Sequence, residues 1–116
     1  MSLTLGNITF DCGEPQKVAA FWAAALGRTP AQGASEHFVA LEGGPAGSPT
    51  MFFVEVPERK TVKNRVHVDL GADDREAEVA RLTSLGATRL ADHDEWGQVW
   101  TVLADVEGNE FCVAQA

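Results

Sequence analysis

The sequence predicts an α+β protein in which one unit, made of a strand, a helix and three further strands, occurs twice. Two helix-like segments each follow one strand-like segment and precede several more. Short motifs also recur: Phe-Asp-Cys-Gly at residues 10–13 matches Val-Asp-Leu-Gly at 68–71, and Leu-Gly at 26–27 recurs at 85–86. We therefore expect two βαβββ units in tandem.

Both helices are predicted from their end signals and from apolar spacing. The first helix should begin at Pro15, which suits the first helical position, and stop at Gly27. The second should begin at Asp73, which has capping-box spacing with Glu76, and end at Gly86. In the first helix one apolar stripe is formed by Val18, Phe21, Trp22, Ala25 and Leu26.

Strands are predicted where polar and apolar residues alternate and β-branched residues are frequent. These segments are residues 5–12, 37–41, 50–56, 65–70, 98–103 and 110–115, with weaker candidates at 29–32 and 88–91. The Gly- and Pro-rich residues 43–49 predict a loop, and the polar residues 57–64 predict the connection between the halves. We expect one domain over residues 1–116, with units at 4–57 and 64–116 joined by a linker at 58–63.

Composition excludes several classes of partner and location. The net charge is −8 and no cluster of Lys or Arg occurs, so we expect neither nucleic acid nor an anionic membrane as partner. The chain has no run of about 18 apolar residues and no signal-peptide pattern, which predicts a cytoplasmic protein. Cys12 and Cys112 lack C-x-x-C spacing and are expected to be free thiols.

The period of two along a strand divides its side chains between two faces. Helices should cover the apolar faces, so the polar faces are expected to look into a concavity or into solvent. In residues 65–70 the apolar face is Val66, Val68 and Leu70, and the polar face is Arg65, His67 and Asp69. In residues 5–12 the apolar face is Ile8, Phe10 and Cys12, and the polar face is Asn7, Thr9 and Asp11.

Three segments carry a family resemblance. Residues 14–27 contain Glu-Pro, Phe-Trp and Ala-Leu-Gly, residues 66–70 read Val-His-Val-Asp-Leu, and residues 105–111 read Asp-Val-Glu-Gly-Asn-Glu-Phe. In this order the chain resembles the glyoxalase-like and bleomycin-resistance-like branch of the vicinal-oxygen-chelate superfamily. The resemblance implies two βαβββ units whose sheets curl into a half-open barrel with a ligand cleft on the concave face, and a homodimer.

The resemblance also implies where metal ligands would lie. Members of that superfamily typically chelate a metal through one residue from each of four strands, and these positions map to Asn7 or Thr9, Val54, His67 and Cys112. Only His67 is a good ligand at its expected place, because valine has no donor atom and one Cys with one His is too small a set. We therefore predict no family-type metal centre and no cofactor, with a divalent metal as the less favoured alternative.

The candidate site combines a histidine, carboxylates and aromatic residues. His67 is the plausible proton carrier, oriented by Asp69 or Asp11; the alternatives are a structural histidine and two solvated carboxylates. Trp96 and Trp100 could wall a planar or apolar ligand. The family positions Asn7, Thr9, Val54 and Cys112 complete the predicted substrate contacts, although Cys112 could simply be a small buried side chain. Residues 92–96 predict a solvated loop rather than a metal-binding one.

Two functions remain open. The first is a binding protein that holds a small organic molecule in its cleft without the family metal centre. The alternative is a lyase, epimerase or dioxygenase-type enzyme of the same superfamily, in which His67 acts with an aspartate or with a non-standard metal.

Overall fold

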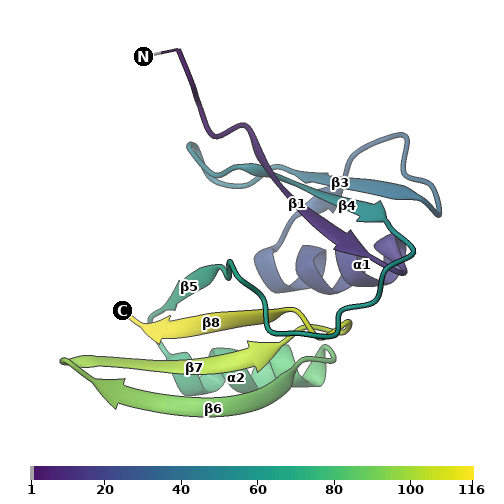
Figure 1. The fold of residues 1–116 in the computed structure, drawn as a ribbon. Helices are drawn as coiled ribbons and strands as arrows, with labels where there is room; N and C mark the ends of the chain where they lie inside the picture. Colours follow the sequence, from purple (N-terminus) through teal and green to yellow (C-terminus); the bar gives the residue numbers. More distant parts are fainter. Residues whose placement is uncertain (1) are drawn as a thin grey trace. The chain divides into compact units, whose positions relative to one another are not determined.

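Each half of the chain builds a four-stranded sheet with one helix on it, which confirms the predicted α+β class and its repeated βαβββ unit (Figure 1). The computed structural model describes residues 2–116. The chain divides into two units between Arg59 and Lys60. The predicted domain includes Met1, which lies outside the described residues, and the limits 1–116, 4–57, 58–63 and 64–116 stay predictions.

The first unit packs its helix against a mixed sheet. Its elements are β1 (Asn7–Cys12), α1 (Pro15–Leu26), β2 (Thr29–Pro30), β3 (Phe38–Glu42) and β4 (Thr50–Glu55). The strand order is β1-β4-β3-β2, with β1 parallel to β4 and the other neighbours antiparallel. Trp22 of α1 and Phe53 of β4 are fully buried, so the apolar stripe of α1 forms the core with this sheet.

The second unit repeats this arrangement. Its elements are β5 (Asp69–Ala72), α2 (Arg75–Ser84), β6 (Thr88–Glu95), β7 (Gln98–Ala104) and β8 (Glu110–Gln115). The strand order is β5-β8-β7-β6, with β5 parallel to β8. Val79 and Leu82 of α2 are buried together with Leu103 of β7 and Val113 of β8, which form the core of this unit.

The helix ends follow local chemistry, with one correction. Pro15 begins α1, and Gly27 ends it in the left-handed conformation (φ 66°) that glycine adopts without strain. The prediction that Asp73 caps α2 is wrong by one residue: Asp74 is the N-cap, and its carboxylate accepts a hydrogen bond of 3.1 Å from the backbone N–H of Ala77. Within residues 2–116, neither helix has the length and apolar character to cross a membrane.

The strand predicted at residues 65–70 is wrong over its first four residues. β5 begins only at Asp69, and Val66, expected on the buried face, is 81% exposed. Before β5, the backbone N–H groups of Asn64 and Glu110 donate to each other's side chains, and the N–H of Cys112 donates to the carbonyl of Val68. Alternating polarity predicts the face of a side chain but not the residue at which strand pairing begins.

The loop predicted at residues 92–96 is also wrong. β6 continues to Glu95 and pairs with β7 as far as Glu95 opposite Gln98. Residues 92–95 are all polar, so no alternation marks them as a strand, because both of their faces carry polar side chains. The strand predicted at 88–91 is thus four residues too short, and the predicted strands other than β5 and β6 begin and end within two residues of the observed limits.

Candidate functional site

A pocket of about 420 Å³ opens on the face of the second sheet that lies opposite α2. We call it the sheet pocket. Its lining comes from β5, β7 and β8, from the connection that precedes β5, and from the turn between β6 and β7. The lining residues are Lys63, His67, Asp69, Trp96, Gln98, Trp100, Val102, Glu110, Cys112 and Ala114.

Alternation along β7 and β8 explains this lining. On β7 the side chains of Gln98, Trp100 and Val102 line the pocket, whereas Thr101 and Leu103, on the other face, are fully buried. β8 behaves in the same way: Glu110, Cys112 and Ala114 line the pocket, and Phe111 and Val113 are buried on the helix side. Steps of two from Trp100 and Cys112 would have found Gln98, Val102, Glu110 and Ala114, which the sequence analysis missed.

Three potential metal-ligating or proton-transferring side chains meet at one end of the pocket. His67 Nδ1 lies 3.1 Å from Asp69 Oδ1, and Cys112 Sγ lies 3.9 Å from His67 Nδ1. All three donor atoms lie within 4.8 Å of one another. The pairing of β5 with β8 causes this convergence, because it places Asp69 directly opposite Cys112.

The environment of Cys112 suppresses its reactivity as a nucleophile. Its side chain is buried, as the sequence analysis allowed, although it also borders the pocket. Burial, and then the nearby Asp69 carboxylate, raise the pKa of the Cys112 thiol to about 11. The thiol is therefore protonated at neutral pH and is a poor nucleophile in the absence of a cation.

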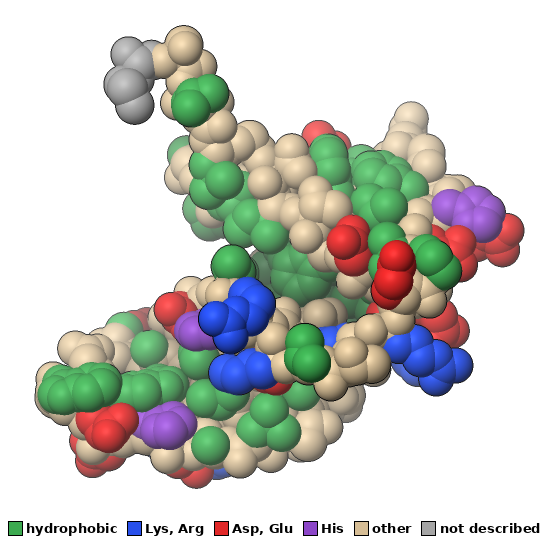
Figure 2. All heavy atoms as spheres, in the orientation of Figure 1, with side chains coloured by type: hydrophobic (Ala, Val, Ile, Leu, Met, Phe, Trp, Pro, Cys, Tyr) green, Lys and Arg blue, Asp and Glu red, His purple; other side chains and the backbone are tan. Residues whose placement is uncertain are grey.

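Two aromatic side chains, Trp96 and Trp100, also line the pocket, and His93 extends them into a stack of three rings. The rings of His93 and Trp100 stack with 4.9 Å between centroids and 17° between planes. Trp96 stacks on Trp100 with 6.3 Å between centroids, and it is 86% exposed. His93 lies opposite Trp100 in the β6–β7 register. The sequence analysis missed this neighbour because it predicted a loop at residues 92–96. Figure 2 shows hydrophobic surface at the end of this unit, where the hairpin turns.

A fixed negative charge lies elsewhere in the pocket lining. The Glu110 carboxylate accepts a hydrogen bond of 3.0 Å from the backbone N–H of Asn64, and it lies 3.1 Å from Lys60 Nζ. The Asn64 N–H and the Lys60 ammonium outweigh burial and lower the pKa of Glu110. Glu110 is therefore ionised and held in place at neutral pH.

The remaining predicted residues belong to the first unit. Asn7, Thr9 and Asp11 are exposed on one face of β1, where Asn7 Nδ2 donates a hydrogen bond of 3.0 Å to Thr9 Oγ1. Val54 lies opposite Asp11 in the β1–β4 register. The structure thus groups the predicted site residues into two sets, one in each unit, and the roles of this first-unit set stay predictions.

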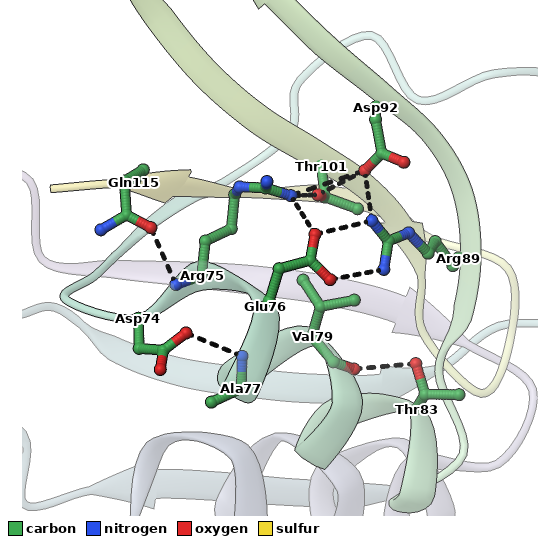
Figure 3. Close-up of polar contacts among 10 residues, drawn as sticks. All are labelled: Asp74, Arg75, Glu76, Ala77, Val79, Thr83, Arg89, Asp92, Thr101 and Gln115. Atoms are coloured by element: carbon green, nitrogen blue, oxygen red, sulfur yellow. Dashed lines mark hydrogen bonds and ion pairs between the residues drawn. The ribbon is translucent and has the colours of Figure 1, made fainter.

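An ionic network on the other face of the second sheet holds the pocket strands to α2 (Figure 3). Arg75 Nη1, at the start of α2, donates to the hydroxyl of the fully buried Thr101. Arg89 donates to both carboxylate oxygens of Glu76, at 3.0 and 3.2 Å, and to Asp92 Oδ1 at 2.8 Å. The Thr101 hydroxyl in turn donates to Asp92 Oδ1 at 2.7 Å. The first turn of α2 and strands β6 and β7 are thereby tied together.

The four-ligand metal set that the family resemblance implied does not fit these residues. Val54 offers only hydrocarbon, and His67 is the one strong ligand among the four mapped positions. The donors that do converge are His67, Asp69 and Cys112, and Asp69 is not among the mapped positions.

Comparisons with known proteins agree with the fold. The sequence profile of a family described as Glyoxalase-like domain matches residues 7–114. No functionally curated protein matches the chain.

Several solved structures are similar over nearly the whole chain. A glyoxalase/bleomycin resistance protein/dioxygenase family enzyme from Burkholderia phytofirmans PsJN is 19% identical with a TM-score of 0.79, covering 97% of this chain and 98% of that one. A mutant fosfomycin resistance protein FosX from Listeria monocytogenes, complexed with Mn(II) and a dihydroxypropylphosphonic acid, is 12% identical with a TM-score of 0.80. The match covers 98% of this chain and 90% of that one. Lactoylglutathione lyase from Agrobacterium tumefaciens is 14% identical with a TM-score of 0.69, and the match covers 100% of this chain and 95% of that one. At these identities the likeness is one of fold.

Proposed function

The chain belongs to the glyoxalase-like domain family, and from this premise we propose that it binds a small planar organic molecule in the sheet pocket without the family's four-ligand metal centre. The observation that carries the proposal is the stacked row of His93, Trp100 and Trp96 beside a pocket of about 420 Å³. A pocket of this size with aromatic side chains in its lining and a few polar groups is typical of small-molecule sites. A FosX relative holds a small phosphonic acid in its structure, which supports the small-molecule class.

The polar groups of the pocket give this ligand an orientation. Asp69 and Glu110 supply carboxylates, Lys63 an ammonium group, and Gln98 an amide that can donate and accept. We expect a flat ring to pack against the aromatic stack at its exposed member, Trp96, and to direct its polar substituents toward His67 and Asp69. The aromatic wall supplies most of the affinity, because such surfaces lose water on contact.

Binding can be tested with chelator-treated protein and a library of planar aromatic compounds, measured by thermal shift and by calorimetry. A ligand should raise the melting temperature, and Trp100→Ala should weaken its binding by about tenfold or more. Trp22→Phe is the matched control, since Trp22 is buried in the core of the first unit. Equal affinities for Trp100→Ala and Trp22→Phe would contradict the proposal.

A second function is favoured by the hydrogen bond between His67 Nδ1 and Asp69 Oδ1. In an enzyme of the lyase, epimerase or dioxygenase type, a carboxylate in this position fixes the imidazole tautomer so that the other ring nitrogen can carry a proton. Exchange of carbon-bound protons of small carbonyl compounds in heavy water, followed by NMR, tests this function. Exchange that is lost in His67→Gln supports an enzyme, and comparison of Asp69→Asn with Asp11→Asn identifies which carboxylate orients the histidine.

We further propose that the protein acts as a homodimer in the cytoplasm. The family resemblance and the presence of edge strands in both four-stranded sheets support pairing, because edge strands need cover. Two free cysteines fit a reducing compartment. Light scattering on the purified protein gives the mass of the assembly, and a monomeric mass at micromolar concentration would exclude the dimer.

A further inference from the structure

We propose that His67, Asp69 and Cys112 together bind one divalent cation of the Zn(II) or Co(II) type, and that the open coordination position of this cation faces the sheet pocket. This site goes beyond the organic ligand proposed above and does not require it. It shares His67 and Cys112 with the four positions mapped from the resemblance, but Asp69 takes the place of the first-unit ligands, so that all three donors lie within the second unit.

The spacing of the three donors matches a small cation. Bonds from zinc to nitrogen, oxygen and sulfur are about 2.0–2.3 Å long, so two ligands of a tetrahedral ion lie roughly 3.2–3.7 Å apart. His67 Nδ1 is 3.1 Å from Asp69 Oδ1 and 3.9 Å from Cys112 Sγ. The Asp69 and Cys112 donor atoms lie within 4.8 Å of each other, so side-chain movements of up to about 1 Å would bring all three atoms to bonding distance of one ion.

Strand geometry holds the donors in place. His67 and Asp69 are two residues apart and both line the sheet pocket. Cys112 lies directly opposite Asp69, and its backbone N–H donates a hydrogen bond of 3.0 Å to the carbonyl of Val68, between the two other ligands. Two ligands thus lie on hydrogen-bonded strands and the third lies two residues before one of them, an arrangement more rigid than three ligands on a loop.

The donor types select the metal. One thiolate, one imidazole and one carboxylate suit Zn(II) and Co(II), whereas Mg(II), Ca(II) and Mn(II) prefer oxygen donors. On binding, the Cys112 thiol loses its proton to solvent and His67 coordinates through Nδ1 as the neutral tautomer that is protonated at Nε2. The thiolate and the carboxylate then balance the two positive charges of the ion, which leaves a fourth position for water or for a ligand in the pocket.

Cobalt provides a direct readout, because a thiolate bound to Co(II) gives a charge-transfer absorption band that depends on the sulfur atom. Untagged protein is stripped with a chelator, kept reduced, and titrated with Co(II). We expect saturation at one Co(II) per chain with the charge-transfer band present. Cys112→Ser should lose this band, while His67→Gln and Asp69→Asn should keep it and bind Co(II) at least about tenfold more weakly.

Cys12→Ser is the matched control. Cys12 is the other buried free cysteine, and its Sγ donates to the carbonyl of Val54 in the first unit. This variant should keep the full band. Circular dichroism confirms that each variant is folded, and His67 and Asp69, both exposed, can be changed with little effect on the core.

The proposal is overturned if folded wild-type protein shows no band at saturating Co(II), or if the band survives in Cys112→Ser and disappears in Cys12→Ser. Its failure is separable from that of the proposed function, because organic ligands are tested on chelated protein. A cobalt band without any organic binding would reject only the binding function, and organic binding without a cobalt band would reject only the cation site.

Discussion

The ring of Trp96 stacks on the ring of Trp100 while the backbone of Trp96 adopts the left-handed conformation, with φ of 54°. Trp96 and Gly97 (φ 75°) form the two-residue turn between β6 and β7. Turns of this kind favour Asn-Gly, because a bulky residue at positive φ is strained by about 1–2 kcal/mol. A tryptophan here thus costs stability at a position where its exposed ring extends the aromatic wall of the sheet pocket.

We therefore predict that Trp96→Asn separates stability from binding. The variant relieves backbone strain and loses only the stacking of an exposed ring, so its free energy of unfolding should rise by about 0.5–1 kcal/mol. Its affinity for a planar ligand should fall about threefold to tenfold. Urea denaturation and calorimetry measure the two effects. Trp96→Phe keeps both an aromatic ring and the backbone strain. It should therefore show no gain in unfolding free energy and a smaller loss of ligand affinity than Trp96→Asn.

The network on the helix face predicts a loss of stability in acid. Hydrogen bonds from Arg89 lower the pKa of Glu76, and those from Thr101 and then Arg89 lower the pKa of Asp92. Groups with lowered pKa values stabilise the fold above their ordinary values of 4.5 and 3.8, and this contribution is lost as the pH falls through the folded-state values. The free energy of unfolding should therefore fall below about pH 4.5, and more gently in Arg89→Met.

Arg81→Met is the control for this experiment. Arg81 pairs with Glu78 along the same helix, at 2.7 Å, but is not part of the network in Figure 3. Its replacement should leave the acid limb of the stability profile nearly as steep as in the wild type. If the unfolding free energy of Arg89→Met fell as steeply with pH as that of the wild type, Arg89 would not be what lowers the pKa values of Glu76 and Asp92 in the folded protein.

A histidine in the first unit predicts the opposite dependence on pH. His37 Nδ1 hydrogen-bonds to Glu55, and this bond, with the charges of Glu55 and Glu36, raises the pKa of His37 above 6.5. A raised pKa stabilises the fold below pH 6.5, and the contribution disappears as the pH rises through the folded-state value. NMR titration of the ring protons should give a pKa above 6.5 that returns toward 6.5 in Glu55→Gln. A wild-type value at or below 6.5 would contradict the interaction.

The parts of the fold that sequence could predict are those with local causes. Pro15 and Gly27 mark the ends of α1 because their backbone preferences act at those positions alone. The start of β5 could not be predicted, because it depends on pairing with β8, which lies far away in the sequence. A polarity pattern predicts which face of a strand a side chain lies on, but it does not predict which other strand supplies the hydrogen bonds.

The site shows the same division. Alternation placed His67 and Asp69 on one face, and this proximity is confirmed by their 3.1 Å contact. That Cys112 joins them follows from the β5–β8 register, which is non-local. The stacking of His93 on Trp100 likewise depends on the exact pairing of β6 with β7, so the sequence indicated its members without indicating the stack.

The turn between β7 and β8 gives the last prediction. Asp105 is only 3% exposed, and its Oδ1 accepts hydrogen bonds from the backbone N–H groups of Glu107 (2.9 Å) and Asn109 (3.0 Å). Asn109 Nδ2 donates to the other oxygen at 3.0 Å. Asp105→Ala removes the acceptor from these partly buried donors, which should cost about 2–3 kcal/mol of unfolding free energy.

Asp105→Asn keeps one carbonyl oxygen and should cost less, about 1 kcal/mol. Asp94→Ala, an exposed position on β6, is the control and should change stability by no more than about 0.5 kcal/mol. Urea denaturation of the three variants distinguishes the contributions of the two oxygens. If Asp105→Ala were no worse than Asp94→Ala, the carboxylate would not be what closes the turn, and the β7–β8 register, which places Val102 opposite Cys112 in the pocket lining, would have to come from strand pairing alone.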